Sequence, residues 1–295
     1  MRLLGALRPV VFWLCLLITP AFADGSDVIV AFRDDAAPFS SRAEDGSYTG
    51  FLADLCEAAV VGAGYTIADR VPITAADRFY HTADAAVDLI CDPTTLTRER
   101  AKTVDFSPVL FIANSSFLEA STATPLSEQG IDAASDCAKV HKEKPRLKLY
   151  GVGMVGKTTA SATYKLAREQ QFLAETEEDT YCVIAFPTHI AAISAICDGQ
   201  ISFYFGDVDI LRVQLASRKG CDASLNGKFR AYEPYSLAIP SSDPVFRRKL
   251  VAALYELFSN DKAQQAYIEA FGDLPKSPAL DMLFRINNIP AGRSE

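Results

Sequence analysis

The sequence lacks several features that would indicate a familiar class of binding site. It contains no Cys-x-x-Cys pair, which argues against a zinc site. It has no run of basic residues, and 37 acidic residues outnumber 29 basic ones for a net charge of −8, which argues against a nucleic-acid partner. Beyond the N-terminal segment, no apolar run reaches the roughly 20 residues of a membrane-spanning helix. There is also no internal repeat and no low-complexity segment.

The N-terminal segment has the parts of a secretory signal peptide in the right order. Arg2 and Arg8 form a basic start, residues 10–18 are apolar, and Ala-Phe-Ala at 21–23 is a small-x-small cleavage site. We expect cleavage after Ala23, which leaves 272 residues, enough for one large domain or two lobes. The alternative is a buried N-terminal strand or helix. The favoured interpretation is a soluble, exported protein.

Six cysteines remain after the expected cleavage, and an even number in an exported chain indicates up to three disulfides. Cys56 falls in a predicted helix and Cys91 at the end of a predicted strand, so a bridge between them within one layer is plausible. The other four cysteines allow three pairings, among which the sequence does not choose: Cys137, Cys182, Cys197 and Cys221.

Strand and helix patterns alternate along most of the chain, which predicts an α/β architecture with largely parallel sheets. The predicted strands are residues 28–32, 86–91, 109–117, 147–155 and 201–205, and the predicted helices are 51–61 and 161–168. Polar residues 121–145 are expected to form a surface excursion.

The end of the chain predicts a further helix. Asp243 is a typical N-cap and the next residue is proline, which suits the first helical position. Phe246, Leu250, Leu254 and Leu257 then recur at helical spacing and mark one apolar face.

Residues 151–159, GVGMVGKTT, match the P-loop pattern G-x-x-x-x-G-K-[ST]. Between a strand and a helix, such a stretch offers backbone N–H groups to an anion. ATP hydrolysis would also need a magnesium-holding acid and a compartment that contains ATP, and the predicted export removes the compartment. We therefore interpret the stretch as an anion cradle, with Lys157 and Thr158 as candidate binding residues, and not as a nucleotide site.

Three further segments carry arginines next to predicted strands or turns. They are VAFRDDAAPFSS with Arg33, PITAADRFY with Arg78, and VDLICDPTTLTRERAKTVDFS with Thr95 and Arg100. Together with YTGFLADL and AYEPYSLAIP, they make the chain resemble the periplasmic polar amino-acid-binding proteins of ABC importers (solute-binding protein family 3, type II periplasmic binding fold). The T-x-T-x-E-R…V-D-F-S block is the specific part of this resemblance, and the other pieces count by their order.

The resemblance implies a two-lobed fold with crossing strands near residues 112–117 and 235–239. Lobe one would hold residues 24–114 plus 236–295, and lobe two residues 115–235. It further implies a periplasmic monomer that binds a small-molecule amino acid and delivers it to a membrane permease, with no cofactor, metal or catalytic residue.

The resemblance also assigns the ends of the ligand. Arg100 would clamp the α-carboxylate, a role that suits its planar, permanently charged guanidinium. Thr95 would support this clamp through its hydroxyl and amide, and the Pro93 carbonyl would accept from the ammonium group. Asp207, with Asp209 as a rival, would be the anion that pairs with the ammonium.

Arg33, Arg78 and His189 match positions that contact the ligand's side chain in glutamate and aspartate binders, so the resemblance implies an acidic amino acid. The aromatic residues that stack a flat or cationic side chain in other members are absent, because Ala36 and Ala75 stand in their places.

Purely structural roles for the same residues also remain open. Arg33 could pair with Asp34 or Asp35, and Arg100 with Glu99 or Asp105. His189 could be hydrogen-bonded to backbone at a helix start, and the lysine of the P-loop-like stretch could reach a carboxylate or extend into solvent.

Two other functions also remain: an enzyme on the same fold, such as a cyclohexadienyl or arogenate-type dehydratase in which the candidate aspartate donates a proton, and a ligand-binding sensor component.

Overall fold

The computed structural model describes residues 27–79, 87–129, 135–156, 159–173 and 175–292. The predicted signal peptide with its cleavage site, and the candidate binding residues Lys157 and Thr158, lie outside the described residues.

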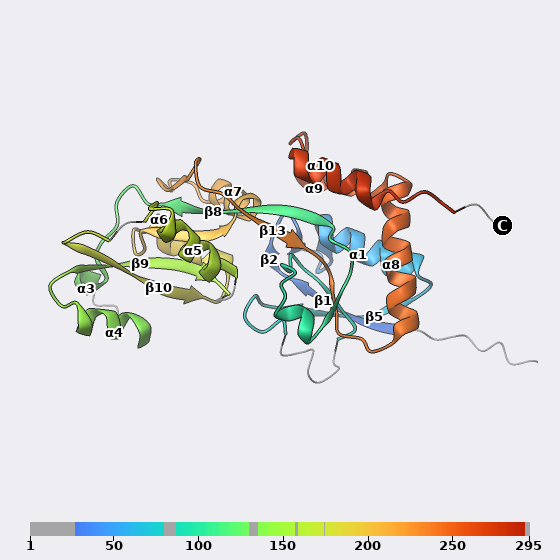
Figure 1. The fold of residues 1–295 in the computed structure, drawn as a ribbon, viewed down its shortest axis with the longest axis horizontal. Coiled ribbons are helices and arrows are strands. Elements are labelled where there is room, and N and C mark those ends of the chain that lie inside the picture. Colours follow the sequence, from blue (N-terminus) through green and yellow to red (C-terminus); the bar gives the residue numbers. More distant parts are fainter. Residues whose placement is uncertain (1–26, 80–86, 130–134, 157–158, 174, 293–295) are drawn as a thin grey trace, which may run out of the picture.

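The described chain forms two lobes, each built on one sheet flanked by helices (Figure 1). The first sheet has the order β5-β1-β6-β14-β7, and its strands are β1 (Asp27–Arg33), β5 (Thr66–Ile73), β6 (Leu89–Cys91), β7 (Asp105–Phe106) and β14 (Ala238–Ile239). The second has the order β10-β9-β11-β8-β12 with β13 also paired to β8, and its strands are β8 (Phe111–Glu119), β9 (Lys148–Val155), β10 (Asp179–Phe186), β11 (Phe203–Asp207), β12 (Ser224–Leu225) and β13 (Ala231–Tyr235). The predicted two-lobed α/β fold is confirmed.

The sheets are mixed, whereas the sequence predicted largely parallel ones. β1 is parallel to β5 and β6, and β9 is parallel to β10 and β11. β14 is antiparallel to both of its neighbours, and β8 is antiparallel to β11, β12 and β13. Strands that follow a helical crossover come out parallel, while the strands near the passage from one lobe to the other are antiparallel.

Helices cover both sheets. Those of the first lobe are α1 (Phe51–Gly62), α8 (Pro244–Ser259), α9 (Lys262–Phe271) and α10 (Pro278–Asn287), and a short 3-10 helix spans Arg100–Lys102. Those of the second are α3 (Leu126–Gln129), α4 (Ser135–Glu143), α5 (Thr159–Glu169), α6 (His189–Cys197) and α7 (Val208–Ser217). A small sheet of β2 (Asp35–Ala36), β3 (Ser40–Arg42) and β4 (Tyr48–Thr49) follows β1.

Helix α8 forms as its sequence predicts. The Asp243 carboxylate caps its N-terminus, and Phe246, Leu250, Leu254 and Leu257 are all buried in the core of the first lobe. Burial of each such side chain contributes roughly 2 kcal/mol, so this face is enough to hold the helix against α1.

Strands β8 and β13 connect the two lobes and pair with each other. Phe111 at the start of β8 packs in the core of the first lobe, and Phe117 near its end packs in a core of the second. The return strand was expected near residues 235–239, but the strand that pairs with β8 is 231–235, and Ala238 and Ile239 belong to the first sheet as β14.

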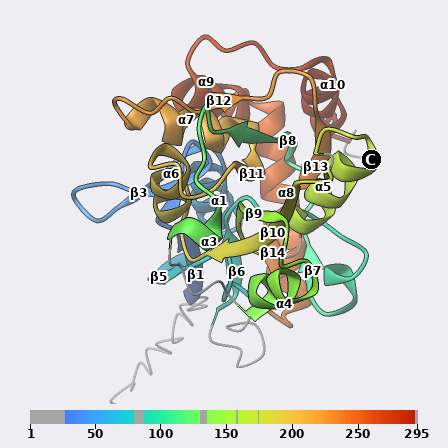
Figure 2. The same ribbon diagram turned by 90° about the vertical axis from the view of Figure 1, so that its left-hand side faces the viewer.

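The expected surface excursion at residues 121–145 is more structured than its polarity suggested. It contains α3 and α4, and Leu126 and Cys137 are fully buried. A disulfide from Cys137 to Cys182 fastens α4 to β10. In both views α4 lies on the opposite side of the molecule from α9 and α10 (Figure 2).

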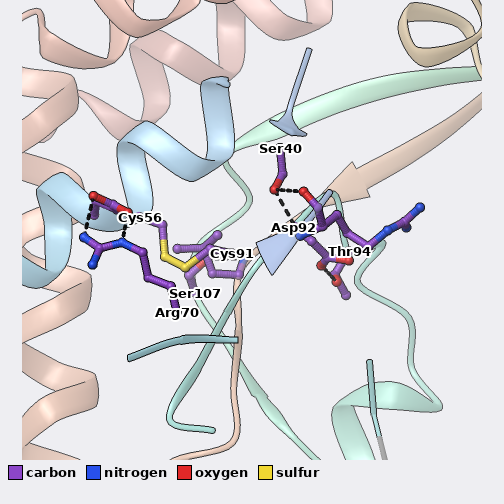
Figure 3. Close-up of a disulfide and its surroundings, with 10 residues drawn as sticks. Ser40, Cys56, Arg70, Cys91, Asp92, Thr94 and Ser107 are labelled. Atoms are coloured by element: carbon purple, nitrogen blue, oxygen red, sulfur yellow. Dashed lines mark hydrogen bonds and ion pairs between the residues drawn. A yellow bond between two sulfur atoms is a disulfide. The ribbon is translucent and has the colours of Figure 1, made fainter. Parts of the chain in front are cut away.

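A disulfide also braces the first lobe. Cys56 of α1 pairs with Cys91 at the end of β6, the pair that the sequence made plausible, and the bridge lies close to Asp92 and Thr94 (Figure 3). The third disulfide joins Cys197 to Cys221 in the second lobe. The first bridge therefore anchors the strand from which the loop of residues 92–100 departs.

Candidate functional site

One cleft between the lobes is lined by every predicted ligand-binding residue that the structure describes: Arg33, Arg78, Pro93, Thr95, Arg100, His189 and Asp207. The free cavity between these residues measures about 50 Å³, and it lies within about 540 Å³ of space outside the protein atoms that is partly open to solvent. Its residues come from the carboxyl ends of β1 and β11, from the loops after β5 and β6, and from the start of α6. Carboxyl ends of neighbouring strands commonly form such sites in α/β sheets.

The first lobe contributes a donor wall, which we define as Arg33, Arg78 and Arg100. Arg33 is buried and donates from Nε and Nη2 to Oδ1 of Asp35, at 2.9 and 2.5 Å. Of the two acids that the sequence offered as partners, Asp35 is the one in this ion pair. Asp34 instead accepts a hydrogen bond from the Tyr48 hydroxyl at 2.9 Å.

Arg78 is also paired within the first lobe. Its Nη1 lies 2.7 Å from Oδ2 of Asp92 and donates to the Pro93 carbonyl at 3.3 Å. Burial lowers the pKa of Arg78, and Asp92 counteracts this. The Nε of Arg78 is buried without a hydrogen-bond partner among the described residues. A buried donor in this state is costly unless a ligand or water accepts from it.

Arg100 lies over the ring of Phe79, with 5.0 Å from Cζ to the ring centroid, and donates from Nη1 to the Thr95 carbonyl at 2.7 Å. Burial first and Arg78 second lower the pKa of Arg100 to about 10, so it remains charged at neutral pH. Phe79 is partly buried, packs against a core cluster of the first lobe and lies under this guanidinium.

The two acids proposed as surface partners of Arg100 have other partners in the structure. Glu99 pairs with Lys102 at 2.7 Å, and Asp105 pairs with Arg247. These contacts separate the two acids from the cleft.

Asp207 faces the donor wall from the second lobe. Its Oδ1 accepts from the N–H groups of Asp209 and Ile210, at 2.7 and 3.1 Å, which caps α7. Its Oδ2 accepts from the Tyr235 hydroxyl at 3.1 Å. Burial, reinforced by Asp209, raises the pKa of Asp207 well above its usual value. The rival Asp209 does not line this cleft and pairs instead with Arg212 at 3.4 Å.

The lining residues that the sequence analysis missed include three with polar side chains that contact one another or a predicted residue: Ser115, Glu233 and Tyr235. Glu233 accepts from the Thr95 hydroxyl, with 2.5 Å between Oγ1 and Oε2, and from the Ser115 hydroxyl. We define the acceptor wall as Asp207, Glu233, Ser115 and Tyr235. The AYEPY segment was the available signal, but which way Glu233 faces depends on how β13 pairs with β8.

His189 joins the lobes. It is the first residue of α6, and its N–H donates to Oδ2 of Asp35 at 2.7 Å, while its ring Nδ1 hydrogen-bonds the Tyr204 hydroxyl. Burial first and Arg33 second lower the pKa of His189 to about 3, so the ring is neutral. Burial would raise the pKa of Asp35, but Arg33 and His189 outweigh it and hold the pKa below its usual value.

The P-loop-like stretch does not form a phosphate loop over its first half. Residues 151–155 are part of strand β9, and a Cβ on Gly151 or Gly153 would lie 2.8 or 2.5 Å from the side chain of Ile201. These glycines therefore make room for packing. Gly156 has a φ of +75°, and a Cβ on it would lie 3.2 Å from that of Ala75 in the first lobe. Its role is a tight turn where the lobes meet.

Within the described ranges, no group of three or more histidine, cysteine, aspartate or glutamate side chains is placed to hold a metal ion. None of the helices in those ranges combines the length and apolar character that crossing a membrane requires.

The chain is similar in sequence to a known solute-binding protein. The chain is 20% identical over 268 residues to the glutamate/aspartate import solute-binding protein of Salmonella typhimurium, covering 88% of this chain and 82% of that protein.

Solved structures match the fold. An ancestral arginine-binding protein bound to arginine superposes with a TM-score of 0.65 at 20% identity, over 84% of this chain and 99% of that one. The arginine-, lysine-, histidine-binding protein ArtJ from Geobacillus stearothermophilus gives 0.63 at 23% identity, over 87% and 99%. The ancestral amino acid-binding protein AncCDT-1, a precursor of cyclohexadienyl dehydratase, gives 0.61 at 21% identity, over 84% and 96%.

The family model of the bacterial extracellular solute-binding proteins, family 3, matches residues 28–273. That range contains both sheets and all of the cleft residues described above. The chain belongs to the bacterial extracellular solute-binding proteins of family 3.

Proposed function

We propose that the protein captures an L-amino acid with an acidic side chain in the periplasm, after cleavage behind Ala23, and delivers it to the permease of an ABC importer. In this proposal it acts as a monomer and performs no chemistry on the ligand. The observation that carries it is the convergence of three arginines and two carboxylates on one interlobe cleft. An amino acid carries the complementary charges at its two ends.

Arg100 is the proposed partner of the α-carboxylate. Its guanidinium is half-buried and keeps its charge, and desolvation strengthens its attraction for an anion. The N-terminus of α5, which begins at Thr159, is proposed as a further source of N–H groups, and Lys157 and Thr158 stay proposed binding residues. Asp207 lies on the opposite wall and is assigned to the ammonium group.

The acidic side chain is the finer part of the proposal. Asp35 and Asp92 compensate Arg33 and Arg78, so these arginines do not require an anionic ligand to be tolerated. Two features nevertheless favour an acceptor at this end: the unsatisfied Nε of Arg78, and Nη1 of Arg33, which takes no part in its two bonds to Asp35. The neutral His189 ring adds no charge at this end of the cleft.

Thermal unfolding of residues 24–295 with added L-glutamate, L-aspartate, L-glutamine, L-arginine, prephenate and Mg-ATP tests the proposal. A ligand that binds the native state raises the midpoint as its concentration exceeds Kd. We expect shifts with glutamate and aspartate. A midpoint shift with glutamine or arginine alone would keep the amino-acid-binding function but would contradict the assignment of Arg33 and Arg78 to an acidic side chain. If no amino acid shifts the midpoint, the proposed binding function is wrong.

The enzymatic alternative has one observation in its favour, the raised pKa of Asp207, which makes it a possible proton donor. Incubating the same protein with prephenate and following its ultraviolet absorbance distinguishes the two, because a binding protein leaves the compound intact.

A further inference from the structure

Three hydroxyl groups in the cleft already donate their protons to carboxylates of the protein. A hydroxyl has one proton to donate and two lone pairs to offer. Thr95 and Ser115 both give their proton to Glu233, and Tyr235 gives its proton to Asp207. These three oxygens therefore face the remaining space as acceptors. The Thr95 hydroxyl, which the resemblance assigned to the carboxylate clamp together with the Thr95 amide, donates to Glu233 and so has lone pairs left for a donor.

The two carboxylates differ in how much bonding capacity they have left. An ionised carboxylate accepts about four hydrogen bonds. Asp207 already accepts three, from two backbone N–H groups and the Tyr235 hydroxyl. Glu233 accepts two, from the hydroxyls of Thr95 and Ser115. Asp207 can thus take about one more donor and Glu233 about two.

An ammonium group brings three N–H donors, each of which needs an acceptor once water is excluded. Asp207 alone leaves two of the three without a charged partner. Glu233 lines the same cleft as Asp207 and Arg100, the residues assigned to the two ends of the amino acid. Together the two carboxylates offer the three positions.

We propose that Glu233 binds the α-ammonium group of the ligand beside Asp207 and so restricts the cleft to primary amines next to a carboxylate. This inference rests on the proposed function, because it concerns the same site. It gives Glu233 a binding role that goes beyond orienting Thr95.

The experiment compares two probes, L-glutamate and glutarate, which lacks the ammonium group, by calorimetry on the wild type and on Glu233→Gln. We expect Glu233→Gln to weaken the binding of L-glutamate at least 10-fold and to change the Kd of glutarate less than 2-fold. The ratio of the two affinities should therefore become smaller in the variant than in the wild type. Glu57→Gln is the matched control, since Glu57 is a partly exposed acid on α1 that pairs with Arg70 away from the cleft. It should leave both affinities unchanged.

The variant Thr95→Val distinguishes direct contact of Glu233 with the ligand from a role of Glu233 in positioning Thr95. It removes the hydroxyl that Glu233 orients but keeps the carboxylate, so we expect a smaller loss of L-glutamate affinity than from Glu233→Gln. Equal losses for both probes in Glu233→Gln, or tighter L-glutamate binding, would overturn the inference. Failure of every amino acid to bind the wild type would instead overturn the proposed function, and the two failures are distinct.

Discussion

The two walls of the cleft hold their charges in different ways. On the donor wall, Arg33 and Arg78 are neutralised by acids of the same lobe, Asp35 and Asp92. On the acceptor wall, the contacts of Asp207 are backbone N–H groups and a hydroxyl. Two of the three arginines of the donor wall are thus paired with acids before a ligand arrives, and Arg100, which donates to a backbone carbonyl, is the one assigned to an anion of the ligand, while Asp207 on the acceptor wall is stabilised by dipoles.

Because of this difference, a substitution in the cleft can change the affinity for the ligand and the stability of the ligand-free protein in different directions. Compensated ion pairs fix the positions of side chains but leave little charge for the ligand, whereas a buried carboxylate held by dipoles, as Asp207 is, is stabilised further when a cation binds beside it. Changes on the two walls should therefore have opposite consequences for the ligand-free protein.

The largest expected effect is that of Arg100→Ala. It removes the arginine assigned to the α-carboxylate, and charge-assisted bonds contribute roughly 1.5 to 3 kcal/mol each, so a bidentate contact predicts a loss of about 100-fold or more. Calorimetry with L-glutamate measures it. Arg98→Ala, two residues away and exposed, is the control. Unchanged affinity in Arg100→Ala would break the assignment of the donor wall.

Asp207→Asn should weaken L-glutamate binding by about 10-fold and raise the unfolding free energy of the ligand-free protein at pH 7. Burial raises the pKa of Asp207, so the folded state disfavours the charged carboxylate, and the neutral amide removes that cost. Urea unfolding and calorimetry give both numbers. Asp209→Asn, outside the cleft, should leave affinity unaltered; a stability loss in Asp207→Asn would contradict the strain argument.

His189→Gln should alter the pH dependence of stability. The folded pKa of about 3 lies below the ordinary value of 6.5, so the unfolded chain binds the extra proton between these values. Stability from the neutral ring is complete above pH 6.5 and falls as the pH drops toward 3, by up to about 1.4 kcal/mol per unit. Urea unfolding from pH 7 to 4 should show a shallower decline in His189→Gln than in wild type. The exposed His141→Gln should keep the wild-type slope.

The smallest effect is expected at the meeting point of the lobes. Gly156→Ala and Gly220→Ala both place a side chain at a positive φ, of +75° and +77°, which costs about 1 kcal/mol. A Cβ at Gly156 also crowds Ala75 across the cleft, whereas none is within 4 Å at Gly220. We expect equal losses of stability but a several-fold loss of affinity in Gly156→Ala alone. Equal affinities would mean that this contact does not limit closure.

The sequence predicted the structure correctly where a residue's role depends on its neighbours in the chain. The cap and the apolar face of α8 follow from propensity and spacing, and both are present. The T-x-T-x-E-R block placed Thr95 and Arg100 on one cleft together with Asp207, although their contacts with a ligand stay predictions.

Glu233 shows where prediction from sequence stops. Its place in the cleft depends on the antiparallel register of β13 with β8, which sets Glu233 opposite Ala113. That register joins residues more than 100 positions apart, and a shift by one would turn the carboxylate to the other face. The partner of Arg33 was likewise undecided between two adjacent acids until β2 fixed their directions.

The three disulfides have a mechanical consequence. Cys56–Cys91 lies in the first lobe, and Cys137–Cys182 and Cys197–Cys221 lie in the second. Each closes a stretch of 24 to 45 residues, and none of the three spans the cleft. The disulfides therefore cross-link each lobe internally, and among the described residues strands β8 and β13 connect the two lobes without a disulfide between them, so covalent stabilisation of the lobes does not fix their relative position.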